Sequence, residues 1–254
     1  MQNFAQDVLI EWANQKLYNR KGILTDSFFY YIYKSKTNSM KSLYESLLDD
    51  FDTIARDMDL KDIINTFLDD HYFISGSIKI SNKANENGLY EVSGKGIVHF
   101  VFGEEFTNGL FEWTRFRGDF YCNNTSIQTL KGGPKEVTGE FSCEDCADLY
   151  SLEGAPIKCE DFNCSNTKIT TLKGCPQKVT GNFYCANCTD LCSLEGAPSV
   201  CNNFDCSNTK ITTLGGGPKR VKNKFTCNLL KLTTWDGAPK GYKNIEANPN
   251  PLRK

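Results

Sequence analysis

The segment Phe162–Asn182, FNCSNTKITTLKGCPQKVTGN, is one complete copy of a unit that repeats along much of the chain. Its opening phenylalanine recurs every 21 residues, and a cysteine follows two residues later each time. The six pairs are Phe120 and Cys122, Phe141 and Cys143, Phe162 and Cys164, Phe183 and Cys185, Phe204 and Cys206, and Phe225 and Cys227. A repeat of this length is typical of a solenoid, in which one coil cannot bury its apolar face alone. The sequence therefore predicts a stack of six full coils.

The rest of each repeat keeps the same register. Residues two apart on a strand share a face, so each phenylalanine and the cysteine after it both point into the core. Two apolar positions come next, occupied by Ile127 and Leu130, Leu149 and Leu152, Ile169 and Leu172, Leu191 and Leu194, Ile211 and Leu214, and Leu232 and Trp235. A Gly-x-Pro corner then closes every repeat, where glycine permits a tight backbone and proline donates no hydrogen bond. So short a repeat leaves little room for a helix, and we expect turns or extended segments on its back.

Alternate repeats differ in one detail. The first aliphatic position follows the cysteine by five residues in the odd coils, as from Cys164 to Ile169, and by six in the second and fourth, as from Cys143 to Leu149. A residue dropped later in the coil compensates for the extra one, so the larger unit is 42 residues long. This alternation indicates duplicated coil pairs.

The consensus Phe-x-Cys followed by Leu-x-Gly-x-Pro resembles a short leucine-rich repeat in which phenylalanine and cysteine replace the two strand leucines. It is similar to arrays, rich in Phe-x-Cys and Leu-x-Gly-Ala-Pro, that are common in bacteriophage and bacterial genomes. Ser-Leu-Glu-Gly-Ala-Pro at 151–156 and 193–198 matches them closely, and the resemblance covers about residues 90–250. The chain departs from the family at the slot of the ladder asparagine, which holds Thr125, Thr167, Thr209 and Leu230.

Residues 1–72 lie outside the repeats, and the spacing of their apolar residues predicts helices. The last of these helices covers Leu60–Asp70. The predicted fold class is therefore α+β: an N-terminal helical bundle followed by a capped leucine-rich-repeat β-solenoid with a parallel sheet. We expect a helical domain at 1–72 and a β-rich linker or cap at 73–117, with strands at Ile78–Ile80 and Ile97–Phe102. The six-coil solenoid then covers 118–243, and a truncated cap rung covers 244–254. Ile245 and Ala247 carry that rung, because they follow Pro239 at the spacing of a further coil.

Twelve cysteines would suggest disulfides in a secreted protein, but residues 1–15 lack the basic start and apolar core of a signal peptide. We expect reduced thiols and a cytoplasmic protein, in the host cytoplasm if it is encoded by a phage. The motifs Cys143–Cys146 and Cys185–Cys188 have zinc-ligand spacing, yet they lie two coils, about 10 Å, apart. Two sulfurs on one zinc lie within about 4.6 Å, so we read these cysteines as core residues and expect no metal. Outside the ladders, the best candidates for exposed thiols are Cys175 and Cys192.

Catalysis finds little support in the sequence. His71 and His99 are the two histidines, and no Gly-x-Ser-x-Gly motif occurs. The acidic stretch Asp57–Asp62 lacks the glycine and closing glutamate of a calcium loop. No apolar run approaches the ~20 residues that span a bilayer. We therefore expect a non-enzymatic protein with no cofactor and no membrane partner.

The function that we expect first is protein binding by rigid display. Tyrosines and carboxylates occupy outward strand positions, an aromatic cluster lies at 28–33, and residues 45–70 hold nine Asp or Glu against two Lys or Arg. The predicted partner-binding residues are Tyr121, Tyr184, Asp119, Glu140, Asp161 and Asp205 on the strands, Phe29, Tyr30 and Tyr33 in the aromatic cluster, and Glu45, Asp49, Asp52 and Asp59 in the acidic segment. Because the resemblance includes phage-encoded arrays, one hypothesis is an inhibitor of the anti-CRISPR kind. It would block a host nucleic-acid-handling defence enzyme sterically or as a nucleic-acid mimic.

Two alternatives stay open. Residues 208–254 hold ten Lys or Arg against two acids, so a nucleic-acid-binding protein would use Lys219, Arg220, Lys222, Lys224, Lys231, Lys240 and Lys243. A thiol-based enzyme or redox protein would need a low-pKa cysteine, which Cys175 or Cys192 would supply. Both a monomer and a homodimer fit the sequence.

Overall fold

The computed structural model describes residues 60–101, 105–107, 109–228 and 232–248. The chain divides into two compact units, residues 1–66 with 108–110 and residues 67–107 with 111–254, and each is considered by itself. The helix α4 (Leu60–His71) is the only helix among the described residues, and it confirms the helix predicted over Leu60–Asp70. The other predicted helices, and with them the N-terminal bundle, lie outside the described residues.

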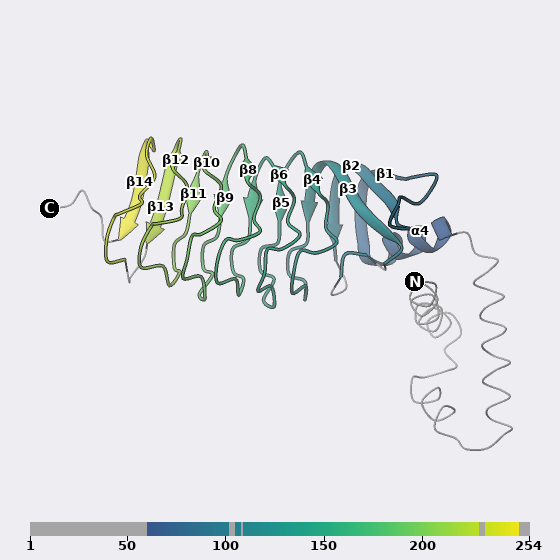
Figure 1. The fold of residues 1–254 in the computed structure, drawn as a ribbon, viewed down its shortest axis with the longest axis horizontal. Coiled ribbons are helices and arrows are strands. Elements are labelled where there is room, and N and C mark those ends of the chain that lie inside the picture. The colour runs from purple at the N-terminus through teal and green to yellow at the C-terminus, as the bar shows by residue number, and fades with distance from the viewer. Residues whose placement is uncertain (1–59, 102–104, 108, 229–231, 249–254) are drawn as a thin grey trace, which may run out of the picture. The chain divides into compact units, whose positions relative to one another are not determined.

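The second unit is a parallel β-solenoid whose coils stack along one axis (Figure 1). Three long strands open it: β1 (Tyr72–Ile80), β2 (Tyr90–Phe100) and β3 (Phe111–Tyr121). Short strands follow in two series, one on each side of a corner. The first series is β4 (Glu136–Val137), β6 (Lys158–Cys159), β8 (Lys178–Val179), β10 (Val200–Cys201) and β12 (Arg220–Val221). The second series is β5 (Phe141–Ser142), β7 (Phe162–Asn163), β9 (Phe183–Tyr184), β11 (Phe204–Asp205), β13 (Lys224–Asn228) and β14 (Asn244–Asn248).

The strand β3 begins both series. Its residues Arg115 and Phe116 pair with β4, and Phe120 and Tyr121 pair with β5. Gly118 marks the corner between these halves, in register with one glycine on each of β2 and β1. Its φ is 133°, and a β-carbon there would lie 1.9 Å from the carbonyl oxygen of Gly96. Only glycine fits this corner, which lets one strand serve two faces.

The same corner explains the alternation of repeat lengths. Three residues, 138–140, separate β4 from β5, whereas two, 160–161, separate β6 from β7. The same difference recurs between β8 and β9 and between β10 and β11. The residue dropped in the even coils is therefore lost at the corner, and the ladders on both faces keep their register.

The core consists of the predicted ladders. Every repeat phenylalanine from Phe120 to Phe225 is buried, and consecutive rings lie 5.3–6.3 Å apart between centroids. The six cysteines that follow them are buried and free. Each coil therefore contributes a phenylalanine and a cysteine to one continuous apolar core, which confirms the solenoid interpretation.

Threonine and cysteine alternate in the slot of the family's asparagine. The Thr125 hydroxyl donates to the carbonyl oxygen of Cys122 at 2.7 Å, and the Cys146 thiol of the next coil donates to that same oxygen at 3.0 Å. Thr167 and Cys188 repeat both contacts with the Cys164 carbonyl, at 2.8 and 3.1 Å. The 42-residue period therefore has a structural reason: one carbonyl per coil pair accepts a hydroxyl from its own coil and a thiol from the next.

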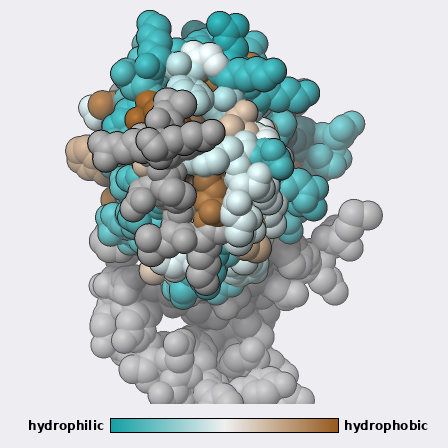
Figure 2. Space-filling model, turned by 90° about the vertical axis from the view of Figure 1, so that its left-hand side faces the viewer, coloured by the Kyte–Doolittle hydropathy of each residue, from teal (hydrophilic) through white to brown (hydrophobic). Residues whose placement is uncertain are grey.

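Aromatic side chains cover the open N-terminal end of the stack. Trp113 is fully buried, its ring centroid lies 5.6 Å from that of Phe120, and its indole Nε1 donates to the Tyr72 hydroxyl at 3.0 Å. At the other end, β14 pairs in parallel with β13 and places Ile245 opposite Phe225 and Ala247 opposite Cys227, at the predicted spacing. In the view onto this end (Figure 2), hydrophilic side chains form the rim around a few hydrophobic ones.

Candidate functional site

The two strand series turn two different surfaces outward. The acidic face comprises outward side chains of the second series and of the adjoining halves of β2 and β3. The cationic groove lies beyond the glycine corner, on the first halves of β2 and β3 and, because β1 runs antiparallel to β2, on the second half of β1. Both surfaces belong to the solenoid unit.

The acidic face brings the predicted strand residues together. Asp119, Glu140 and Asp161 follow one another in consecutive coils, beside the parallel row of Tyr121, Ser142, Asn163, Tyr184 and Asp205. The Tyr121 hydroxyl donates to Glu140 at 3.2 Å. One carboxylate oxygen of Asp119 accepts the backbone N–H of Glu140 at 2.9 Å, and Asp161 accepts that of Asn182. These contacts fix the carboxylates while leaving each of them oxygen atoms for a partner.

The electrostatics of this face follow from crowded negative charge. Burial, then the charges of Glu140 and Asp119, raise the pKa of Tyr121 to about 12. Burial also raises the pKa of Glu140, and the neighbouring Asp161 and Asp119 raise it further, while the hydrogen bond from Tyr121 opposes them. Ser142, in register with Tyr121, is 1% exposed, and its Oγ has no hydrogen-bond partner among the described residues. The face therefore offers carboxylate acceptors and a phenol that stays protonated at neutral pH, whereas the Ser142 hydroxyl lies beneath it.

An aromatic row extends the acidic face toward β1, and the sequence analysis missed it. Phe73, His99 and Tyr121 are in register on three neighbouring strands. The rings of His99 and Tyr121 stack at 4.9 Å, and Phe73 is 64% exposed. Ile97 and Val101, two residues either side of His99, are also exposed. A strand was predicted over Ile97–Phe102, but the strand before it was predicted to begin at Ile78 rather than Tyr72, so Phe73 was not assigned to this face.

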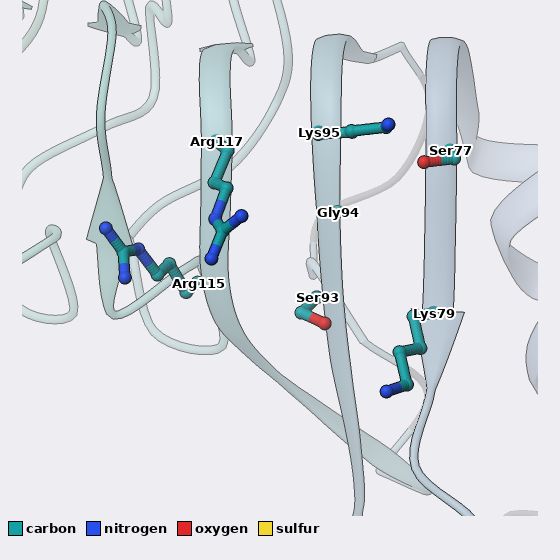
Figure 3. Close-up of a pocket in the computed structure, with 7 residues that line it drawn as sticks. All are labelled: Ser77, Lys79, Ser93, Gly94, Lys95, Arg115 and Arg117. Atoms are coloured by element: carbon teal, nitrogen blue, oxygen red, sulfur yellow. The ribbon is translucent and has the colours of Figure 1, made fainter.

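The cationic groove was also missed by sequence analysis. It has a volume of about 470 Å³ and is lined by Ser77, Lys79, Ser93, Gly94, Lys95, Arg115 and Arg117 (Figure 3). In register across the strands, Ser77, Lys95 and Arg117 form one row, and Lys79 faces Ser93 in the next. Figure 3 shows Lys95 and Ser77 extending toward one another between β2 and β1, while Arg115 reaches toward β4. There the Nε of Arg115 lies 3.6 Å from Glu136, which Lys158 also contacts at 3.0 Å.

The basic residues predicted near the C-terminus are divided between surfaces. Arg220 lies on β12 and pairs with Lys240, so both belong to the row of the first series. Lys224 lies on β13 and its Nζ is 2.6 Å from Glu246 on β14, which raises the lysine's pKa. Lys219, Lys222 and Lys243 are exposed, and Lys231 lies outside the described residues.

Eleven of the twelve cysteines are buried in the described structure. The prediction that Cys175 is exposed is wrong: it is 4% exposed, its thiol donates to Gly196 at 3.1 Å, and burial raises its pKa to about 12. Cys192 is exposed, as predicted. Among the described residues, no group of three or more His, Cys, Asp or Glu side chains is arranged to hold a metal ion.

One thiol of each CxxC motif has a low pKa. The neighbouring Cys122 thiol, and then the Thr125 hydroxyl, lower the pKa of Cys146 to about 7. Cys188 has the same arrangement with Cys164 and Thr167. Both sulfurs are fully buried, however, so the folded chain offers no route by which a substrate would reach them.

The remaining predicted site residues, Phe29, Tyr30, Tyr33, Glu45, Asp49, Asp52 and Asp59, lie outside the described residues. In the part of the chain that the structure describes, no helix combines the length and hydropathy that crossing a bilayer requires. Comparisons with protein-family models, curated proteins and solved structures found no match to this chain.

Proposed function

We propose that this chain is a non-enzymatic scaffold that binds a partner protein through the acidic face and its aromatic end. The observation that carries the proposal is the alignment of exposed and half-buried aromatics with half-buried carboxylates on one face of a rigid stack. Phe73 and Tyr121 supply the kind of large side chain that dominates protein interfaces. Asp119, Glu140 and Asp161 supply charges that steer a basic partner and fix its register.

The rigidity of the acidic face supports the same proposal. The strands beneath are fixed by ladders on both sides of the corner, so the face changes little in shape when it binds. Preorganisation of this kind reduces the entropy lost on association.

The finer proposal concerns the partner. We infer from the resemblance to phage and bacterial repeat arrays that the chain belongs with them and blocks a host nucleic-acid-handling enzyme. The acidic segment at 45–70 would then occupy a basic channel of that enzyme. Reversing Glu45, Asp49, Asp52 and Asp59 to lysine should abolish binding of the enzyme, and unchanged affinity would remove the mimicry mechanism while leaving the scaffold role in place.

The scaffold role is tested by affinity capture followed by measurement of the captured protein's affinity for two variants. In the first, Asp119, Glu140 and Asp161 are changed to lysine. In the control, Asp148, Glu153 and Asp190, which are ion-paired carboxylates away from this face, receive the same change. We expect the first variant to lose the partner and the control to keep it. Equal affinities would contradict the proposal, because the net charge of the two variants is the same.

A further inference from the structure

Three cations of the groove differ from the lysines on the turn side of the coils in having no carboxylate in contact with them. On the turn side of the coils, Lys131, Lys168, Lys173 and Lys210 each contact an Asp or Glu of a neighbouring coil at 2.7–3.1 Å. Within the described residues, no such partner lies beside Lys79, Lys95 or Arg117. Three like charges on adjacent strands repel one another, so their grouping has no benefit for folding.

The backbone holds these three cations in a fixed pattern. Lys95 is opposite both Ser77 on β1 and Arg117 on β3, and Lys79 is opposite Ser93. Neighbouring strands are about 4.8 Å apart, so the two rows bring hydroxyl donors and cations within a few ångströms of one another. Arginine, lysine and serine together form the donor set that recognises phosphate oxygens.

The cationic surface continues along the axis of the stack. Beyond Arg115 and Glu136, the outward positions of the first series carry Lys158 and Lys178, which are paired in register. Further on, Arg220 and Lys240 are paired in the same way. The one exposed apolar residue described in this row is Val200. A linear row of positive charge fits a linear polyanion better than it fits a small anion or an apolar surface.

The lining of the groove also indicates which part of a nucleic acid it would contact. Bases of single strands are bound by stacking on aromatic rings, and the groove contains none among its lining residues. Phosphate contacts, in contrast, need only cations and hydrogen-bond donors. We propose that the groove of Ser77, Lys79, Ser93, Lys95 and Arg117 is a binding site for the phosphate backbone of a nucleic-acid duplex. This site is separate from the acidic face, and it does not depend on the function proposed above.

The test measures binding of a labelled, mixed-sequence DNA duplex of about 20 base pairs to the full chain over a series of salt concentrations. The variant carries Lys79→Gln, Lys95→Gln and Arg117→Gln. We expect wild-type affinity to fall steeply with salt, and the variant to bind at least about tenfold more weakly at low salt. A plot of log affinity against log salt concentration should be shallower for the variant, by about 0.9 for each removed cation that contacts a phosphate.

A matched control carries Lys131→Gln, Lys168→Gln and Lys173→Gln, which removes the same net charge from the ion-paired turn side. It should bind the duplex like the wild type. Equal losses in both variants, or no binding by the wild type at low salt, would overturn the proposal. Tighter binding of a polyglutamate peptide, a single strand or phosphatidylserine vesicles than of the duplex would overturn it as well. Thermal unfolding of each variant distinguishes a lost site from a lost fold.

Discussion

The inward and outward sides of the same strands follow different rules. Inward positions keep the same or a similar apolar residue from coil to coil, as when Phe162 stacks between Phe141 and Phe183. Outward positions change from coil to coil: Tyr121 is followed by Ser142 in the next coil. The contrast teaches that repetition is required where coils pack on one another, whereas the charge pattern outside is not set by packing. The outward residues are therefore the ones that we connect with binding.

The largest effect should come from breaking an inward ladder. Phe162→Ala removes a fully buried ring between two stacked neighbours and should lower the free energy of unfolding by about 3–5 kcal/mol. Denaturant unfolding followed by circular dichroism measures it. The control Lys178→Ala changes an exposed side chain and should stay within about 0.5 kcal/mol of the wild type. Similar stabilities for the two variants would show that the ring ladder does not hold the coils together.

An intermediate effect should come from the corners. Gly154 has a φ of 94°, and a β-carbon there would lie 2.4 Å from the Leu130 carbonyl group. We expect Gly154→Ala to cost about 1–3 kcal/mol, because alanine would be strained at this φ and the preceding coil is too close to its β-carbon. Gly215→Ala is the matched control, since its β-carbon would come no nearer than 3.6 Å to another atom. Equal changes in stability for the two variants would contradict this expectation, because the backbone angle and the close contact are specific to Gly154.

A small gain in stability should come from removing the charge of Glu140 on the acidic face. Burial and neighbouring carboxylates raise the pKa of Glu140, so its charged form is less favourable in the folded chain than in the unfolded one. The wild type should therefore lose stability as the pH rises from the unfolded pKa of Glu140 through its folded pKa. Glu140→Gln removes this loss and keeps an acceptor for Tyr121.

The measurement is the unfolding midpoint of this variant and of the wild type as a function of pH. We expect the variant to be slightly more stable at neutral pH, with the difference vanishing in acid. Glu153→Gln, at an exposed ion pair, should show no such gain. If Glu140→Gln were instead less stable than the wild type at neutral pH, the charged carboxylate of Glu140 would stabilise the fold, which contradicts this expectation.

The sequence predicted the inward side of the fold well. A coil can stack on its copy only if the same apolar residues recur at the same spacing, so the 21-residue period located the buried phenylalanines and the rung at Ile245. The position of Cys175 was misjudged, because the direction of a corner side chain depends on backbone angles that the period does not give. The equivalent residues Gly133, Ala155, Ala197, Gly217 and Ala238 are all small, which was a signal of a confined site.

The outward side was predicted only in part. Asp119, Glu140 and Asp161 were placed on one face because they share a repeat register. Lys79, Lys95 and Arg117 lie before the regular repeats, on strands whose alignment includes an irregularity between Val92 and Gly94. These three residues do not recur at the 21-residue spacing. Their proximity therefore depends on the strand pairing of β1, β2 and β3, which the sequence does not specify. The alternation Arg115-x-Arg117, with Ser77-x-Lys79 and Ser93-x-Lys95, was the local hint.

The contrast between the two sides is tested most directly by the stability of the groove variant. Lys79→Gln, Lys95→Gln and Arg117→Gln together should leave the denaturant midpoint unchanged or raise it at low salt, because mutual repulsion is removed, and added salt should erase the difference. A midpoint well below that of the wild type at every salt concentration would contradict this expectation. It would mean that the three cations hold the fold together and are not free for a ligand.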